Sequence, residues 1–244
     1  MSFTYKIETL YRHRNAIKAC QGAMDIVKLF IDSSTCNVRI QKEKNQLFTQ
    51  FHHICRKYEK GTGTPCSSAD GSEEMEAVIT TDVLRRAGID VTIAGLTESS
   101  CVKCSRDVKI CVDAKLQDAV NQKYDVVILP GGLGGSKAFA DSAEVGKLLQ
   151  QQEQENRLIA AICAAPTALK AHGIAKGKQV TSYPAMKDQL TDYYKYLEDK
   201  VVTDGNLITS RGPATAFAFG LVIAEKLIDK QTADNVAKAM LYTE

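Results

Sequence analysis

One cysteine of the chain lies where a nucleophile would be expected. The five apolar residues 158–162 predict a strand buried on both faces, because no polar position alternates with them. Cys163 follows at once, and Pro166 and Gly173 suit the first turn and the end of a short helix. A thiol on such a strand-to-helix turn, as in the nucleophile elbow of hydrolases, lies beside free N–H groups that stabilise a thiolate. The alternative is a small apolar side chain packed at a strand end.

A glycine-rich run is the second feature that could do chemistry. Residues 131–135 follow another apolar segment, but their spacing fits neither a dinucleotide-binding loop nor a P-loop. A nucleotide site is therefore not expected. Instead, the N–H groups of Gly131 and Gly132 are expected to face the Cys163 sulfur and to form an oxyanion hole for a developing negative charge.

The other cysteines give weaker signals. Cys101 and Cys104 form a single CxxC within a predicted hairpin, and one CxxC is only half of a zinc site, so no metal is expected. Incidental thiols are the better interpretation, and the same holds for Cys111. Any exposed member of this group could oxidise, but we expect peroxide to oxidise Cys163 before Cys104 or Cys111.

Strands and helices alternate from residue 72 onward, and this order must position the candidate residues. Strands are predicted near 90–95, 124–130, 158–162, 179–182, 201–203 and 207–210, with a hairpin at 102–112. Helices are predicted at 73–87, from the glycine run to about 156, at 213–228 and at 232–241. The alternation indicates an α/β sandwich with a mostly parallel sheet, in which sites gather at the carboxyl ends of the strands.

Composition and charge exclude several classes of protein. The 244 residues are 44% apolar and 25% charged, with a net charge of +2, as in ordinary globular proteins. No apolar run approaches the roughly 20 residues of a membrane helix, and no signal peptide is recognisable, so neither a membrane span nor export is expected. The eight cysteines are then expected to be reduced thiols in the cytoplasm. Nucleic acid is not indicated as a partner of the main domain.

The N-terminal quarter of the chain differs in character from the rest. Residues 1–60 hold eleven Lys/Arg and five Asp/Glu, a net +6, and the Gly- and Ser-rich stretch 61–71 resembles a linker. Apolar spacing predicts an amphipathic helix over about 5–31, which would pack on the main domain. The alternatives are a transit sequence, a membrane-surface helix or a nucleic-acid arm. We expect 1–68 to be an atypical basic extension, helical or loosely ordered, and 69–244 to form the main domain.

Several motifs of the main domain occur in a fixed order. They are DGSEEMEAV (70–78), DVLRRAGI (82–89), VTIAGL (91–96), CSRDV (104–108), DVVILPGG (125–132), LIAAICAAPTAL (158–169) and LITSRGPAT (207–215). Together they resemble the Parkinson-disease-associated protein deglycase family of the PfpI and class I glutamine amidotransferase-like superfamily. The resemblance runs from about Ala69 to the C-terminus and implies a flavodoxin-like three-layer sandwich.

The resemblance also implies roles for single residues. Cys163 would be the nucleophile and the oxidation-sensitive thiol, and Glu76 its carboxylic partner. The backbone donors around the pocket would be Gly131, Gly132 and Ala164. The family is homodimeric, and Arg106 corresponds to a position that reaches the site of the neighbouring subunit.

The function predicted from these residues is that of a cofactor-independent, cysteine-dependent glyoxalase or protein deglycase. Methylglyoxal and its adducts would be the substrates, as small carbonyl compounds or glycated proteins. The alternative is a non-enzymatic redox sensor or chaperone that uses an oxidisable Cys163. The expected location is the cytoplasm, with the mitochondrion and the nucleus as further compartments.

Two departures from the family pattern carry further expectations. Tyr183 replaces a histidine that many members carry near the cysteine, and His172 lies on the helix after the elbow, so a Cys–His pair is not expected. Proton transfer would then fall to Glu76, which would keep its proton if it were buried beside sulfur. The first strand of the family is expected to be missing, because residues 64–69 (TPCSSA) contain no aliphatic side chain larger than alanine. Segments 26–31 and 37–40 are the candidates to fill its place.

Overall fold

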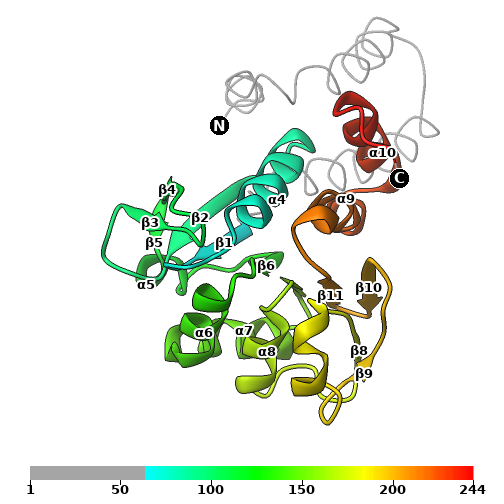
Figure 1. The fold of residues 1–244 in the computed structure, drawn as a ribbon. Helices are drawn as coiled ribbons and strands as arrows, with labels where there is room; N and C mark the ends of the chain where they lie inside the picture. Colours follow the sequence, from blue (N-terminus) through cyan, green and yellow to red (C-terminus); the bar gives the residue numbers. More distant parts are fainter. Residues whose placement is uncertain (1–63, 244) are drawn as a thin grey trace, which may run out of the picture. The chain divides into compact units, whose positions relative to one another are not determined.

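The computed structural model describes residues 64–243, which all lie in one compact unit of the chain (Figure 1). The predicted helix at 5–31, the basic segment 1–60 and the replacement strands at 26–31 and 37–40 lie outside the described residues.

A seven-stranded sheet forms the centre of the described unit. Its strands run in the order β10-β11-β7-β6-β1-β2-β5, and only the pair β10 and β11 is antiparallel. The strands are β1 (Thr64–Ser68), β2 (Val91–Gly95), β5 (Ala114–Lys115), β6 (Val126–Leu129), β7 (Leu158–Ile162), β10 (Val201–Asp204) and β11 (Leu207–Ser210). The predicted sandwich with a mostly parallel sheet is thereby confirmed.

Helices cover both faces of this sheet. They are α4 (Glu74–Arg86), α5 (Leu116–Ala119), α6 (Leu133–Asp141), α7 (Ala143–Gln154), α8 (Pro166–Ala171), α9 (Ala216–Leu227) and α10 (Lys230–Ala239). In Figure 1, α4, α9 and α10 lie on one side of the sheet, and α6, α7 and α8 lie on the other.

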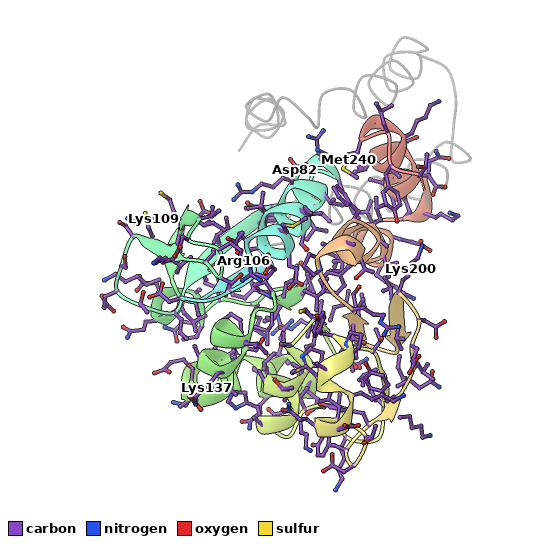
Figure 2. All side chains as sticks on the ribbon, in the orientation of Figure 1. Asp82, Arg106, Lys109, Lys137, Lys200 and Met240 are labelled. Atoms are coloured by element: carbon purple, nitrogen blue, oxygen red, sulfur yellow. The ribbon has the colours of Figure 1, made fainter. Side chains whose placement is uncertain are left out.

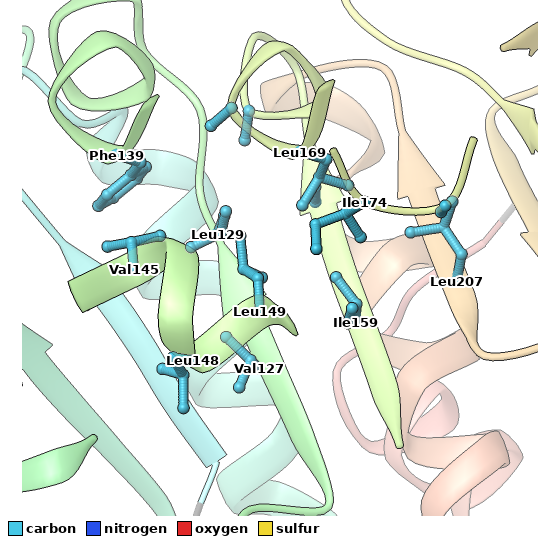
Figure 3. Close-up of a cluster of buried hydrophobic side chains, with 14 of the residues drawn as sticks. Val127, Leu129, Phe139, Val145, Leu148, Leu149, Ile159, Leu169, Ile174 and Leu207 are labelled. Carbon is cyan, nitrogen blue, oxygen red and sulfur yellow. The ribbon is translucent and has the colours of Figure 1, made fainter. Parts of the chain in front are cut away.

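Strand β6 explains why there are two cores. Its four residues are all buried, and successive side chains of a strand point to opposite faces. Val127 and Leu129 belong to the cluster under α6, α7 and α8, part of which is shown in Figure 3. Val126 and Ile128 belong to the cluster under α4 and α9. The middle layer therefore contributes apolar side chains to two separate interfaces.

The central strand β1 corrects one prediction. Thr64–Ser68 pairs in parallel with β2 over five residues, from Thr64 opposite Val91 to Ser68 opposite Gly95. It also pairs with β6, with Cys66 opposite Ile128. The expectation that the first family strand is missing is therefore wrong. A strand is held by its backbone ladder, so two well-defined neighbours can position a segment without aliphatic residues. β1 ends at Ser68, just before the predicted boundary between the N-terminal extension (1–68) and the main domain (69–244). That boundary stays a prediction.

The remaining predicted elements differ from the structure only in detail. Segment 179–182 contributes β8 (Gln179–Val180), which pairs with β9 (Lys195–Tyr196) in a separate two-stranded sheet. The hairpin is present as β3 (Cys101–Lys103) and β4 (Lys109–Cys111). The side chains of Lys109 on β4 and Lys137 on α6, both labelled in Figure 2, are exposed. Within residues 64–243, no helix is both long enough and apolar enough to cross a membrane.

Candidate active site

Three loops meet at the carboxyl ends of the central strands. The loop after β1 leads into α4, whose first turn carries Glu76; the loop after β6 carries Gly131 and Gly132; and Cys163 follows β7. Parallel strands bring these ends to the same edge of the sheet. The structure thus brings together the thiol, the carboxyl group and the glycine run, which lie far apart in the sequence.

The backbone of Cys163 is held in an unusual conformation. Its φ is +63°, in the left-handed region, which few residues other than glycine adopt. The Cys163 N–H donates to the Ser210 carbonyl at 3.0 Å, and the Cys163 carbonyl accepts from the Tyr183 N–H at 2.8 Å. Both bonds come from neighbouring segments, so the surroundings impose the strained turn. Cys163 lies on the strand-to-helix turn that the sequence predicts, with 9% of its surface exposed.

Glu76 presents a fully buried carboxyl group to the thiol. Its side chain has no exposed surface, and its Oε2 accepts the Gly131 N–H at 2.7 Å. The second oxygen of this carboxyl group, Oε1, is buried and has no hydrogen-bond partner among the described residues, and the thiol and the carboxyl group affect each other's pKa. The expectation that the Gly131 N–H faces the sulfur is corrected here, because that N–H is used by the carboxyl group.

Gly131 packs against both Cys163 and Glu76, and its position has no room for a side chain. A Cβ at this position would lie 2.5 Å from the Cβ of Cys163, 2.7 Å from Oε2 of Glu76 and 2.9 Å from the Ile162 carbonyl oxygen. Real Cβ atoms do not make such contacts. The glycine is therefore required because any side chain here would overlap with both Cys163 and Glu76.

Gly132 brings the loop after β1 against the loop after β6. Its φ is +85°, and a Cβ there would lie 2.3 Å from the Gly71 carbonyl oxygen. The Glu73 N–H donates to the Gly131 carbonyl at 2.9 Å, and the Ser72 hydroxyl accepts from the Ala69 N–H at 3.1 Å. These contacts fix the start of α4, and with it the position of the buried carboxyl group.

The pKa of the Glu76 carboxyl group is raised. Burial is the main cause and raises it to about 7, and the nearby charge of Glu73 acts in the same direction. The hydrogen bonds from Gly131 and from the Cys163 thiol oppose the shift but do not cancel it. The expectation that a carboxyl group buried beside sulfur holds its proton agrees with this direction.

The pKa of the Cys163 thiol is also raised, to about 12. Burial is again the main cause, and the charge of Glu76 adds to it, whereas the N–H groups of Gly132 and Ala164 lower the pKa. The predicted backbone donors thus act on the sulfur, but burial and the carboxylate outweigh them. Because one negative charge disfavours a second in this pocket, the thiolate forms when the carboxyl group holds the proton.

The other predicted residues lie outside this arrangement. Arg106 is exposed, its N–H donates to Glu74 Oε1 at 2.9 Å, and its guanidinium donates to the Ser105 carbonyl. Its role at a neighbouring subunit stays a prediction. His172 is bonded through Nε2 to the Phe139 carbonyl at 2.8 Å, on the α6 side of the sheet.

The two further cysteines with a predicted redox role differ in exposure. Cys104 is buried, with 4% of its surface exposed, and burial together with Glu74 raises its pKa to about 11. Cys111 is exposed on β4. The order in which Cys163, Cys104 and Cys111 oxidise stays a prediction, because burial raises the pKa of Cys104 and of Cys163 alike.

Sequence reasoning missed two residues that shape the site. Ser210 holds the Cys163 N–H through its carbonyl, and Glu73 raises the pKa of Glu76. The acidic residues at the start of α4 were a visible signal for the effect of Glu73 on the pKa of Glu76. No local pattern indicates the first, because the bond depends on the neighbouring strand β11 rather than on the identity of a side chain.

The arrangement agrees with comparisons to known proteins. The family model described as DJ-1/PfpI family matches residues 66–226, about two-thirds of the chain. The chain belongs to the DJ-1/PfpI family. The matched range begins inside β1 and includes Glu76, Gly131, Gly132 and Cys163.

Three curated relatives of the domain show how similar it is to other members. Protein dj-1beta of Drosophila melanogaster is 59% identical over 174 residues, which cover 71% of this chain and 93% of the relative. The Parkinson disease protein 7 homolog of Danio rerio is 53% identical and covers 72% and 95%. The glutathione-independent glyoxalase DJR-1.2 of Caenorhabditis elegans is 42% identical and covers 70% and 91%.

Solved structures agree with the fold. The crystal structure of Drosophila melanogaster DJ-1beta superposes with a TM-score of 0.74 at 56% identity and covers 75% of this chain and all of that chain. An oxidised DJ-1 from Toxoplasma gondii has a TM-score of 0.72 at 34% identity and covers 75% of this chain and all of that chain. The sandwich is therefore that of the DJ-1/PfpI family.

Proposed function

We propose that the chain is a cofactor-independent, cysteine-dependent glyoxalase or protein deglycase that acts on methylglyoxal and its adducts. The observation that carries the proposal is the buried thiol of Cys163 beside the buried carboxyl group of Glu76, at the carboxyl ends of the central strands. A relative whose name describes a glutathione-independent glyoxalase supports the same reaction class.

The reaction begins with a transfer of charge inside the pair. The Glu76 carboxylate takes the thiol proton, and the sulfur attacks the aldehyde carbon of methylglyoxal, so that a C–S bond forms and the carbonyl oxygen becomes negative. The N–H groups of Gly132 and Ala164 would stabilise that oxygen. The proton on Glu76 then neutralises it and gives a hemithioacetal.

The same carboxylate can complete the conversion. It removes the proton from the carbon that carries the sulfur and returns it to the neighbouring carbon, which turns the hemithioacetal into a thioester. Water hydrolyses the thioester to a 2-hydroxy acid and releases the thiol. The 2-hydroxy acid contains the atoms of one methylglyoxal and one water molecule, so the reaction needs no external oxidant or reductant. A pKa of about 7 suits a group that must both accept and donate a proton near neutral pH.

The test is methylglyoxal consumption by the full chain and its variants. Cys163→Ser should lower kcat/KM by about a thousandfold or more, because a serine hydroxyl is far less acidic than a thiol and gives up its proton to the Glu76 carboxylate much less readily. Cys104→Ser is the matched control and should stay within about twofold of wild type, since Cys104 is buried at the hairpin. Tyr183→Phe should have only a modest effect, as its contact with Cys163 is made by the backbone. Full activity of Cys163→Ser would overturn the proposal.

A second candidate function is redox sensing through Cys163. It is favoured by the donors around the sulfur, the N–H groups of Gly132 and Ala164 and a protonated Glu76, which could bind the oxygens of a sulfinate. Peptide mass mapping after dilute peroxide should place the sulfinate at Cys163. A sulfinate in a protein that turns over no methylglyoxal would favour this function over the enzyme.

A further inference from the structure

Two thiols, one exposed and one partly exposed, face each other across the hairpin formed by β3 and β4. Cys101 on β3 is the direct cross-strand partner of Cys111 on β4, and their sulfur atoms lie 3.2 Å apart. Cys111 is exposed and Cys101 is partly exposed, whereas Cys104, the other member of the CxxC, is buried. The structure therefore pairs Cys101 with a residue outside the motif.

The hydrogen bonds of the hairpin show which kind of pair this is. The Val112 N–H donates to the Ser100 carbonyl, and the Cys104 N–H donates to the Val108 carbonyl. Bonded and non-bonded pairs alternate along an antiparallel ladder, so the pair between Cys101 and Cys111 is non-hydrogen-bonded. Such pairs have Cα atoms roughly 4.5 Å apart, which lies within the separation that a disulfide can span.

We propose that Cys101 and Cys111 form a second redox site, a reversible disulfide across β3 and β4 that exchanges with low-molecular-weight disulfides. This site is separate from the Cys163 pocket, and the proposal does not depend on the proposed enzymatic function. The thiols need no backbone movement to reach one another, since they are already in contact across the ladder.

The exchange proceeds in two displacements. The thiolate of the more exposed Cys111 attacks one sulfur of glutathione disulfide, whose S–S bond breaks and releases one glutathione thiol. Cys101 then attacks the sulfur of Cys111 and releases the second glutathione. Two protein thiols lose two electrons in total, and one glutathione disulfide gains them. Two glutathione molecules reverse the steps.

The cross-link would stiffen the part of the hairpin that is hydrogen-bonded to the loop between β1 and α4. Lys103 lies two residues from Cys101 on the same strand; its N–H donates to the Asp70 carboxylate, and its carbonyl accepts from the Gly71 N–H, both at 2.8 Å. These bonds tie the hairpin to the loop that leads into α4. A disulfide would keep β3 and β4 paired and so preserve this attachment under oxidising conditions.

Peptide mapping tests the proposal directly. The full chain is equilibrated with glutathione disulfide, free thiols are alkylated, and the protein is digested with trypsin without reduction. The basic residues at 86, 103, 106, 109 and 115 separate the three cysteines into peptides 87–103, 104–106 and 110–115. The expected product joins 87–103 to 110–115, and reduced glutathione should remove the link.

Two variants provide the controls. Cys104→Ser should leave the yield of the link within about twofold, whereas Cys101→Ser should abolish it and leave Cys111 bound to glutathione. A link between 87–103 and 104–106, a link between two copies of 110–115, or alkylated thiols at both positions in the oxidising buffer would each overturn the proposal.

Discussion

Strands β1 and β7 lie on either side of β6, and each delivers one half of the candidate site. β7 is a run of apolar residues that ends at the thiol of Cys163. β1 has the sequence TPCSS, includes a proline that offers no backbone N–H, and leads to the loop before Glu76. The thiol therefore rests on a strand with an apolar sequence, and the carboxyl group on a strand specified mainly by its neighbours.

The difference between the two strands shows that the thiol and the carboxyl group are positioned in different ways. Cys163 follows β7 directly, and backbone bonds to Ser210 and Tyr183 hold it in place. Glu76 lies further from its strand, and its position depends on β1 occupying the gap between β2 and β6. The carboxyl half should accordingly be the more sensitive to changes in the chain before α4.

Removal of β1 should have the largest effect. A fragment that begins at residue 69 lacks the strand and leaves the backbone groups of β2 and β6 unpaired, a loss of several kcal/mol in a domain with about 5 to 15 kcal/mol of stability. We expect this fragment to be insoluble or inactive. A fragment that begins at residue 62 keeps β1 and should fold and retain activity, as measured by thermal unfolding and methylglyoxal consumption.

The pair of fragments also distinguishes two accounts of the N-terminal segment. If the fragment from residue 62 fails while the full chain is active, residues 1–61 contribute to the fold. If the fragment from residue 69 is folded and active, β1 is dispensable, and the comparison of the two strands does not hold.

A methyl group between the two halves should have the next largest effect. Gly131→Ala would place a Cβ within 2.9 Å of three atoms, two of them on Cys163 and Glu76. We expect a loss of about a hundredfold in kcat/KM, together with about 1–3 kcal/mol of stability. Gly177→Ala is the control, because a Cβ there meets no atom within 4 Å and only its φ of +80° is strained. Equal activity of both variants would show that the two groups need not be in contact.

The buried carboxyl group of Glu76 should make the free energy of unfolding depend on pH. The folded-state pKa of Glu76, about 7, lies above its ordinary value of 4.5, so its contribution is full below pH 4.5 and is lost as the pH rises through 7. The free energy of unfolding of wild type relative to Glu76→Gln should fall by about 3 kcal/mol over this window. Urea titrations at several pH values measure it.

A surface glutamate provides the control for this experiment. Its own backbone N–H and the Ser142 hydroxyl hold the pKa of Glu144 below its usual range, which is the opposite direction. The difference between wild type and Glu144→Gln should therefore not decrease as the pH rises from 4.5 to 7. A flat profile for Glu76→Gln relative to wild type would contradict the buried, shifted carboxyl group.

The two strands also explain how much could be predicted from the sequence. The apolar run 158–162 predicts β7 and the turn at Cys163, because a strand buried on both faces has a composition of its own. The same reasoning failed for β1, because its pairing is made by backbone atoms that every residue except proline supplies in full.

Contacts between distant segments could not be derived from local patterns. The pairing of Glu76 with Cys163 was expected only from the family resemblance, and the direction of the Gly131 N–H depends on where that carboxyl group ends. The hairpin was predicted, but its register was not, so the facing positions of Cys101 and Cys111 emerged only from the structure.

The most direct test of the central claim is the pH dependence of Cys163 alkylation by iodoacetamide in wild type and in Glu76→Gln, followed by mass mapping. If the carboxylate takes the thiol proton, the wild-type rate should rise with a midpoint near the Glu76 pKa of about 7. Without this acceptor, burial keeps the thiol protonated, and the midpoint should move up by more than about one pH unit. The same midpoint in both proteins would contradict a proton shared between Cys163 and Glu76.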